Sequence, residues 1–278
     1  MYELLIDGLL FRQSSGVGGD IVTIDMAAGT ASKRPGQVAT LRFTGLPGHD
    51  KKVEIWLPHN ETTELVALRT NARIEPVPDN SRKVWLHHGS SISHGSNADS
   101  PPSIWPALAA SLGDVDLKIG IDLVNTDLMR LRAFTPAVHG FLDTIREGHP
   151  GTPLLVISPL YCPIHEDTPG PGAFDLSALA EGKVSFRATG DPAERKAGKL
   201  TLTIIREELR RIVQQRAADD PHLRYLDGLD LYGQLDFADP PFPDQLHPDG
   251  PAHRRIGERF AKLAFGRGGP FFVERATA

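Results

Sequence analysis

The sequence predicts an α/β protein in which a parallel sheet with flanking helices is preceded by a small all-β module. From residue 83 onward, short apolar segments alternate with longer amphipathic segments, which is the order typical of a parallel sheet. Before residue 80, short period-two segments are separated by turn residues such as Asp7-Gly8. We therefore expect a β-sandwich-like module over residues 1–80 and an α/β domain over residues 81–278. The module is short, because a β-sandwich usually needs about 100 residues.

The individual elements follow from apolar pattern and turn punctuation. In the module we expect strands at 4–6, 38–43, 53–57 and 65–68, and a linker at 76–80. In the second domain we expect strands at 84–86, 117–121, 154–158 and 223–226. The helices of that domain are expected near 102–112, 131–147, 201–217 and 251–265. The stretch 163–198 is rich in Pro, Gly and charge, and its length predicts a lid or a substrate-facing excursion.

The composition excludes several classes of protein. The single cysteine, Cys162, cannot form an internal disulfide or supply the paired thiolates of a zinc or iron–sulfur site. The net charge of −5 is spread without a long basic run, so we expect neither a nucleic-acid partner nor a membrane partner. The first residues lack a secretory signal, and no stretch of eighteen apolar residues occurs, so a cytoplasmic location is expected. We expect no metal and no cofactor, and the oligomeric state stays open.

A small-residue turn follows the first strand of the α/β domain. It reads Gly89-Ser90-Ser91-Ile92-Ser93-His94-Gly95 and leads through a polar loop into a helix. Ligands of open parallel sheets sit at the carboxyl ends of the strands. A serine in this turn is therefore accessible to solvent, and nearby backbone amides can stabilise an oxyanion. Turns rich in serine and glycine are common, so this signal is weak by itself.

A second turn precedes the last helix and reads Asp244-Gln-Leu-His247-Pro248. An aspartate three residues before a histidine can hydrogen-bond the imidazole Nδ1 and leave Nε2 free as a general base. An ordinary surface turn is the alternative interpretation of this segment alone. The two turns together, one after the first strand and one before the last helix, are a much stronger indication of nucleophilic catalysis.

On these two turns the chain resembles the GDSL/SGNH hydrolases, in particular the actinomycete-type branch with an N-terminal β-sandwich-like module. Gly89-Ser90-Ser91-Ile92 resembles the first block of the family, with Ser90 in place of its aspartate, and Asp244-Gln-Leu-His247 resembles the last block. The resemblance covers about residues 83–266 and implies a flavodoxin-like α/β fold. It also implies acyl-ester chemistry with Ser91 as nucleophile, His247 as general acid and base, and Asp244 as the residue that orients His247.

The sequence departs from the family where the oxyanion donors are expected. Family members use the amide of the nucleophile, a glycine amide in the second block and an Asn side chain in a Gly-x-Asn third block. Here the third block reads Gly120-Ile121-Asp122, and an ionised Asp122 donates no hydrogen bond and repels a developing oxyanion. Asn125 lies three residues on and is a substitute candidate, and His94 is a candidate for contact with substrate.

One βα unit of the family is also missing between Ser91 and Gly120. Two placements of the strand at 117–121 stay open. In the third-block position, the oxyanion glycine is absent and the preceding helix must change sheet face to keep a right-handed crossover. In the second-block position, Gly120 is itself the oxyanion glycine and the Asn donor is absent. Either placement predicts a weakened oxyanion hole.

The sequence therefore predicts a serine esterase or acylhydrolase that acts on a small-molecule or carbohydrate ester. An acyltransferase to an alcohol acceptor is the alternative within the same chemistry. A catalytically impaired protein of the same fold that binds carbohydrate or another ligand is the alternative from a different class. Tyr161 and Phe174 are expected to line an acyl pocket if the 163–198 segment folds over the site.

Overall fold

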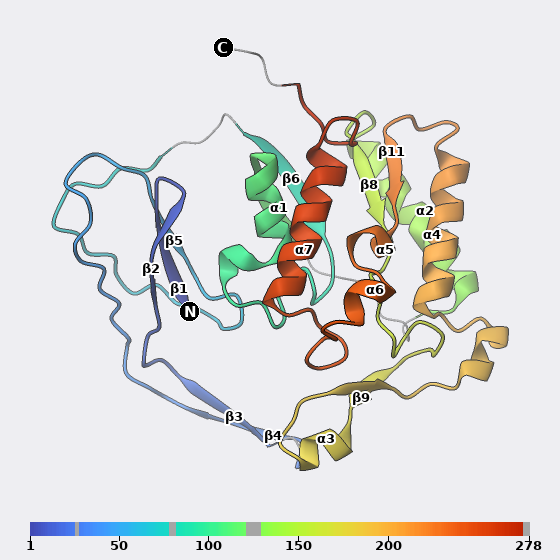
Figure 1. Cartoon of the computed structure of the whole chain (residues 1–278), viewed down its shortest axis with the longest axis horizontal. Coiled ribbons are helices and arrows are strands. Elements are labelled where there is room, and N and C mark those ends of the chain that lie inside the picture. Colours follow the sequence, from blue (N-terminus) through green and yellow to red (C-terminus); the bar gives the residue numbers. More distant parts are fainter. Residues whose placement is uncertain (26–27, 78–81, 121–128, 275–278) are drawn as a thin grey trace. The chain divides into compact units, whose positions relative to one another are not determined.

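The computed structural model describes residues 1–25, 28–77, 82–120 and 129–274. By its internal contacts the chain divides into two units, one of residues 1–80 with 100–102 and one of residues 81–99 with 103–278. Strands are the regular elements described in residues 1–77, whereas strands and helices alternate in the second unit (Figure 1).

The described part of the first unit contains five strands: β1 (Tyr2–Ile6), β2 (Leu9–Ser14), β3 (Ile21–Asp25), β4 (Thr30–Arg34) and β5 (Val53–Trp56). β1 is the centre of an antiparallel sheet of order β2-β1-β5, and β3 pairs with β4 in a separate hairpin. Leu4 and Ile6 of β1 are buried, whereas every residue of β3 and β4 is exposed. Packing in this unit is therefore centred on β1.

Two of the four strand predictions for this unit are wrong, because residues 38–43 and 65–68 form no strand. Their apolar pattern suits a strand, but a strand also needs a neighbour for its backbone hydrogen bonds. Three observed strands, β2 to β4, were not expected. Asp7 and Gly8 have φ angles of 51° and 81°, as a two-residue hairpin turn requires, so the expected turn folds β2 back on β1.

The second unit carries its strands in chain order with helices between them. Its described strands are β6 (Lys83–His88), β7 (Val115–Gly120), β8 (Leu154–Ile157), β9 (Gly172–Phe174), β10 (Phe186–Ala188) and β11 (Leu223–Leu226). Its α-helices are α1 (Trp105–Gly113), α2 (Leu131–Gly148), α3 (Leu176–Ala180), α4 (Leu202–Arg216), α5 (Gly228–Leu231), α6 (Gln234–Phe237) and α7 (Gly250–Phe260). Short 3₁₀ turns lie at Pro101–Ser103 and Pro192–Ala197, and a π-helical turn at Ala261–Phe265 continues α7.

The four strands and four helices expected for the α/β domain are confirmed to within a few residues. The described strands form two parallel pairs, β6 with β7 and β8 with β11, which are not joined by hydrogen bonds into one sheet. The register pairs His88 with Gly120, so both strands of the first pair end together. The α/β class is confirmed, and the continuous flavodoxin-like sheet stays a prediction.

Helices α1 and α7 pack side by side against the first strand pair (Figure 1). Trp85, Trp105, Ile256 and Phe260 are buried in their common core. Helix α7 begins at an Asp249 N-cap whose side chain accepts the Ala252 amide, with Pro251 in its first turn. Because its apolar residues recur every four positions, it presents one apolar face to α1.

Helices α2 and α4 cover the second strand pair, where Leu142, Ile212, Val213 and Leu223 form a separate buried cluster. The segment 163–198 is not a structureless loop, because it carries β9, α3, β10 and a 3₁₀ turn. β9 and β10 pair antiparallel. Among the described residues, no helix is both long and apolar enough to cross a lipid bilayer.

Candidate active site

The turn after β6 presents Ser91 at the surface. The amides of Ser93 and His94 both donate to the Ser90 carbonyl, at 2.8 and 3.1 Å, so the chain coils tightly as soon as the strand ends. Gly89 is required there, because a Cβ at this position would collide with Ser93 Oγ and with the His87 ring. The Ser91 side chain is left exposed at the carboxyl end of the strand.

The turn before α7 folds Asp244 and His247 onto each other. One carboxylate oxygen of Asp244 accepts the amides of Leu246 and His247, at 2.9 and 2.7 Å. Gln245 takes a left-handed conformation with φ of 68°, which lets the chain reverse within three residues. Within the Asp-x-x-His spacing, the backbone hydrogen bonds alone therefore hold the carboxylate in place, in addition to its contact with the His247 ring.

The structure brings Ser91, His247 and Asp244 together in one hydrogen-bonded chain. Asp244 Oδ2 lies 2.8 Å from His247 Nδ1, and His247 Nε2 lies 3.1 Å from Ser91 Oγ. With the Nδ1 proton donated to the carboxylate, Nε2 is the acceptor for the Ser91 hydroxyl. This arrangement joins two turns that are 156 residues apart in sequence.

Asp244 is buried, with 7% of its surface exposed. Burial alone raises the pKa of this carboxyl, but the hydrogen bonds from the His247 ring and from two backbone amides outweigh it and lower the pKa to about 2. Asp244 is therefore ionised at neutral pH, and it can hold the His247 Nδ1 proton and stabilise an imidazolium.

Asn97 is a member of this cluster that the sequence did not reveal. Its Nδ2 donates to Asp244 Oδ2 at 3.0 Å and to the His247 carbonyl at 3.4 Å. It stands six residues after Ser91 in a left-handed conformation, with φ of 62°. The one sequence signal was its place in the Gly95-Ser96-Asn97 turn, which is also typical of any tight turn.

Two buried histidines, His253 and His87, form hydrogen bonds with residues of the turn that carries Ser91. Trp105 donates its amide to His253 Nδ1 at 3.3 Å, so Nε2 carries the proton and donates to the Ser96 carbonyl at 3.1 Å. His87 Nε2 lies 2.8 Å from Ser93 Oγ. Burial is the main cause that lowers the pKa of His87 to about 4, with smaller effects of His88 and His94. Both side chains tie the turn to the core.

The oxyanion side of Ser91 is described only in part. Within the described residues the Ser91 amide donates no hydrogen bond. Gly120 is the last residue of β7 and pairs with His88, the last residue of β6. Ser91 follows His88 by three residues. Asp122 and Asn125 lie outside the described residues. His94 is exposed on the nucleophile turn, where its amide donates to Ser90.

The β9–β10 hairpin brings two aromatic rings to the histidine. Phe186 and His247 have ring centroids 5.5 Å apart at 80°, and Phe174 lies against Phe186 at 4.8 Å. Phe174 thus reaches the site through Phe186, which sequence reasoning missed. Tyr161 instead contacts Phe237, at 5.7 Å. The hairpin is fixed to the acid-bearing turn by the Phe186 amide, which donates to the Asp244 carbonyl at 2.9 Å.

The thiol of Cys162 and the clusters of possible metal ligands were the other candidates for a reactive site among the described residues. Cys162 is buried, and burial raises the pKa of its thiol to about 12, so it is not a nucleophile at neutral pH. Among the described residues, no group of three or more His, Cys, Asp or Glu side chains could hold a metal ion.

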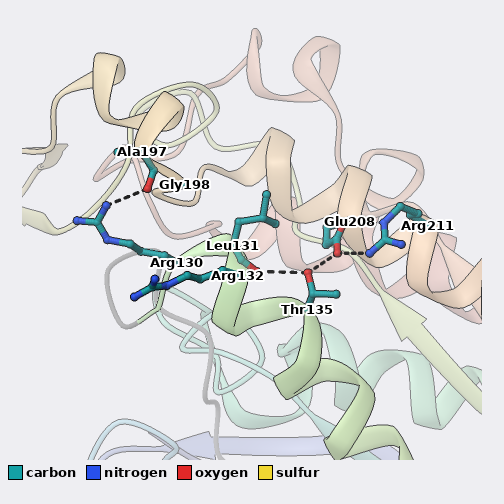
Figure 2. A pocket seen from close by; sticks show the side chains of 8 residues that line it. All are labelled: Arg130, Leu131, Arg132, Thr135, Ala197, Gly198, Glu208 and Arg211. Atoms are coloured by element: carbon teal, nitrogen blue, oxygen red, sulfur yellow. Dashed lines mark hydrogen bonds and ion pairs between the residues drawn. The ribbon is translucent and has the colours of Figure 1, made fainter.

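A separate hollow of about 650 Å³ lies where the start of α2 meets the 3₁₀ turn and α4, and Figure 2 shows its lining. Ser91, His247 and Asp244 are not part of it. Its charged groups are largely paired internally: Arg130 donates to the Ala197 carbonyl at 2.9 Å, and Arg211 donates to Glu208 at 2.9 Å. The hydrogen-bonded chain at Ser91, rather than this hollow, has the geometry of a reactive site.

Comparison of the sequence with protein-family models and with curated proteins finds no match. Three solved structures are similar in fold. The salicylyl-acyltransferase SsfX3 from a tetracycline biosynthetic pathway is 24% identical, with a TM-score of 0.59 over 93% of this chain and 71% of that chain.

The second structure is a carbohydrate esterase family 2 enzyme with a carbohydrate-binding domain from Corynascus thermopiles (Myceliophthora fergusii). It is 15% identical, with a TM-score of 0.53 over 94% of this chain and 84% of that chain. The third is a GDSL-like lipase from Bacteroides ovatus, at 18% identity and a TM-score of 0.52 over 93% of this chain and 72% of that chain. At these identities the similarity establishes a shared fold.

Proposed function

We propose that this chain, which has the SGNH/GDSL hydrolase fold of those three structures, is a serine-dependent esterase. The hydrogen-bonded chain from Ser91 through His247 to Asp244 is the observation that carries the proposal. A serine hydroxyl is a weak nucleophile unless a base accepts its proton, and an ionised carboxylate behind that base stabilises the charge it acquires. The fold alone would not justify an activity, because one fold can carry many functions.

In the proposed reaction, Ser91 Oγ attacks the ester carbonyl carbon while its proton passes to His247 Nε2. The Ser91 amide donates to the developing oxyanion, and the Gly120 amide is the proposed second donor. The tetrahedral intermediate collapses, the bond to the alcohol oxygen breaks, and His247 gives its proton to that oxygen. Water then enters beside His247, gives up a proton to Nε2 and attacks the acyl carbonyl carbon. The second tetrahedral intermediate collapses, the bond to Ser91 Oγ breaks, and His247 returns the proton to that oxygen as the acid leaves.

Transfer of the acyl group to an alcohol is the second candidate function. It differs only in the molecule that enters beside His247 at the second step. The ring of Phe186 against His247 favours it, because an apolar surface at this place excludes water and can hold an organic acceptor. A small-molecule or carbohydrate ester is the proposed substrate class, and a ligand-binding protein without activity is the remaining alternative.

The test is covalent labelling with a fluorophosphonate probe, together with hydrolysis of p-nitrophenyl acetate. We expect labelling of the native chain, complete loss of labelling in Ser91→Ala, and a fall in hydrolysis of at least about 10⁴-fold. Ser96→Ala is the matched control, since this serine lies in the same turn, and it should be labelled normally. Absence of labelling in the native chain would favour the ligand-binding alternative, and addition of alcohol acceptors separates transfer from hydrolysis.

A further inference from the structure

The aromatic pair beside His247 is not part of the hydrophobic core. Phe174 and Phe186 face each other across β9 and β10, with ring centroids 4.8 Å apart and an interplanar angle of 30°. Both side chains are only partly buried, and neither belongs to a core cluster of the described residues. A rigid, partly exposed aromatic pair presents apolar surface that a ligand can cover at a small entropic cost.

The pair is held at a defined distance from the reacting atoms. The Phe186 amide donates to the Asp244 carbonyl, so the hairpin and the acid-bearing turn are joined through the backbone. The Phe186 ring then meets the His247 ring at 80°, with centroids 5.5 Å apart. The Phe174 ring extends this apolar surface through its contact with the Phe186 ring, at 4.8 Å between centroids. The apolar surface next to His247 is therefore larger than one ring.

The role of His247 decides which half of an ester this surface can contact. A general acid must lie within hydrogen-bond distance of the oxygen to which it gives its proton, and that oxygen belongs to the alcohol half. In the proposed reaction the carbonyl oxygen faces the Ser91 and Gly120 amides instead. We propose that Phe174 and Phe186 form the binding surface for the alcohol half of the substrate, and that this half is apolar or aromatic, which narrows the proposed substrate class from carbohydrate esters to small-molecule esters. The inference rests on the proposed esterase function, since it takes His247 as the acid.

The same surface meets the entering nucleophile at the second step, because that molecule occupies the place that the leaving alcohol vacates. An apolar alcohol is bound there more tightly than water. The pair therefore favours acyl transfer to an apolar alcohol over hydrolysis, without any change in the reacting groups.

The experiment compares esters that differ in one half at a time. Methyl and benzyl acetate share the acyl group and have alcohols of similar acidity, whereas methyl acetate and methyl butanoate share the alcohol. We expect Phe186→Ala to lower kcat/KM for benzyl acetate by about tenfold, the effect of exposing most of one aromatic contact, and to change the values for both methyl esters by less than about threefold. Phe186→Leu should restore part of the preference for benzyl acetate.

Phe141→Ala is the matched control, because Phe141 is a partly exposed phenylalanine on α2 that contacts His88 and not His247. It should leave all three values unchanged. In the acyl-transfer version, the native chain should partition the acetyl group from p-nitrophenyl acetate to benzyl alcohol in preference to methanol, and Phe186→Ala should lose this preference.

The outcomes separate the two proposals. Equal hydrolysis by Ser91→Ala would overturn the esterase function itself. If hydrolysis depends on Ser91 but Phe186→Ala lowers all three esters equally, then Phe186 only supports His247 and the inference is wrong. If the loss in kcat/KM depends on the acyl group, so that methyl butanoate is affected more than benzyl acetate, the surface binds the other half of the ester. The inference is then equally wrong.

Discussion

The two sides of Ser91 differ in how they are known: the described residues define the histidine side, and the sequence provides most of what is expected on the oxyanion side. On the histidine side, Asp244 accepts hydrogen bonds from His247, from two backbone amides and from Asn97, and an aromatic hairpin is tied to the same turn. On the oxyanion side, the described residues offer the Ser91 amide and the backbone end of β7 at Gly120. Activation of the nucleophile therefore rests on contacts within the described residues, whereas the weakened oxyanion hole that the sequence predicts is the expected limit on the rate.

The largest effect on the rate is expected from a change on the histidine side. Asp244→Asn keeps the size of the side chain but places an amide near His247 Nδ1, which favours the tautomer with the proton on Nε2. That tautomer cannot accept the Ser91 proton, so we expect kcat to fall by about 10⁴-fold at neutral pH. Steady-state hydrolysis of p-nitrophenyl acetate measures it.

Asp249→Asn is the control for this change. Asp249 is an acid on the same loop that caps α7, and asparagine caps a helix equally well. Activity close to that of the native chain is expected. A loss of less than tenfold in Asp244→Asn would show that the observed hydrogen bond does not govern the reaction.

On the oxyanion side, we expect a gain of activity. If the strand at 117–121 takes the third-block position, Asp122→Asn replaces a carboxylate that repels an oxyanion by a carboxamide donor; if it takes the second-block position, with Gly120 as donor, the substitution should have little effect. One oxyanion donor is worth about 10²–10³-fold in kcat, so in the third-block position an increase approaching 10²-fold is expected in the acylation rate. Stopped-flow release of p-nitrophenol measures this rate.

Asn125→Ala complements it, since a fall in rate there would identify Asn125 as the substitute donor. A native rate as high as that of well-characterised esterases, with no response to Asp122→Asn, would mean that the oxyanion side is complete after all.

The smallest effect is on the free energy of unfolding and concerns His87, which contacts Ser93 in the turn that carries Ser91. The pKa of His87 is lowered from 6.5 to about 4 in the folded chain, mainly by burial, so protonation favours unfolding. This contribution to stability is fully present above pH 6.5 and is lost as the pH falls from 6.5 toward 4, by about 3 kcal/mol in total. Urea unfolding at pH 7 and pH 4.5 gives the change in free energy.

His87→Gln should reduce the difference between the two pH values, because glutamine does not titrate. His88→Gln, at the exposed neighbouring position, should change the difference much less, because His88 is only a minor cause of the lowered pKa of His87. An identical pH dependence in His87→Gln and the native chain would exclude His87 as the titrating group.

The strands and helices of the second unit were predictable because burial imposes a period on their sequences. Ile256 and Phe260 lie four residues apart on α7, and Trp85 and His87 alternate with exposed neighbours on β6. In the first unit this signal fails, since β3 and β4 are exposed on both faces and 38–43 has apolar residues without a strand. Pairing depends there on neighbours that a local pattern does not specify.

Ser91, His247 and Asp244 could be selected from sequence because two short motifs each confine their residues to one turn. Within Asp244-Gln-Leu-His247 the spacing alone brings carboxylate and imidazole together. Asn97 and Phe186 could not be selected in this way. Their contacts with the Asp244 turn span 147 and 58 residues, and neither residue carries a motif that points across such a distance.

By itself, the sequence determined the α/β class of the second unit, the positions of its principal strands and helices, and the two turns that carry the reacting groups, because each of these depends on residues close together in the chain. Only the tertiary structure decided that the turns meet within hydrogen-bond distance, that Asn97 joins them and that an aromatic hairpin borders His247. Those contacts arise when α7 packs against α1 and when β10 is tied to the Asp244 turn, and packing between distant segments leaves no periodic trace in either segment.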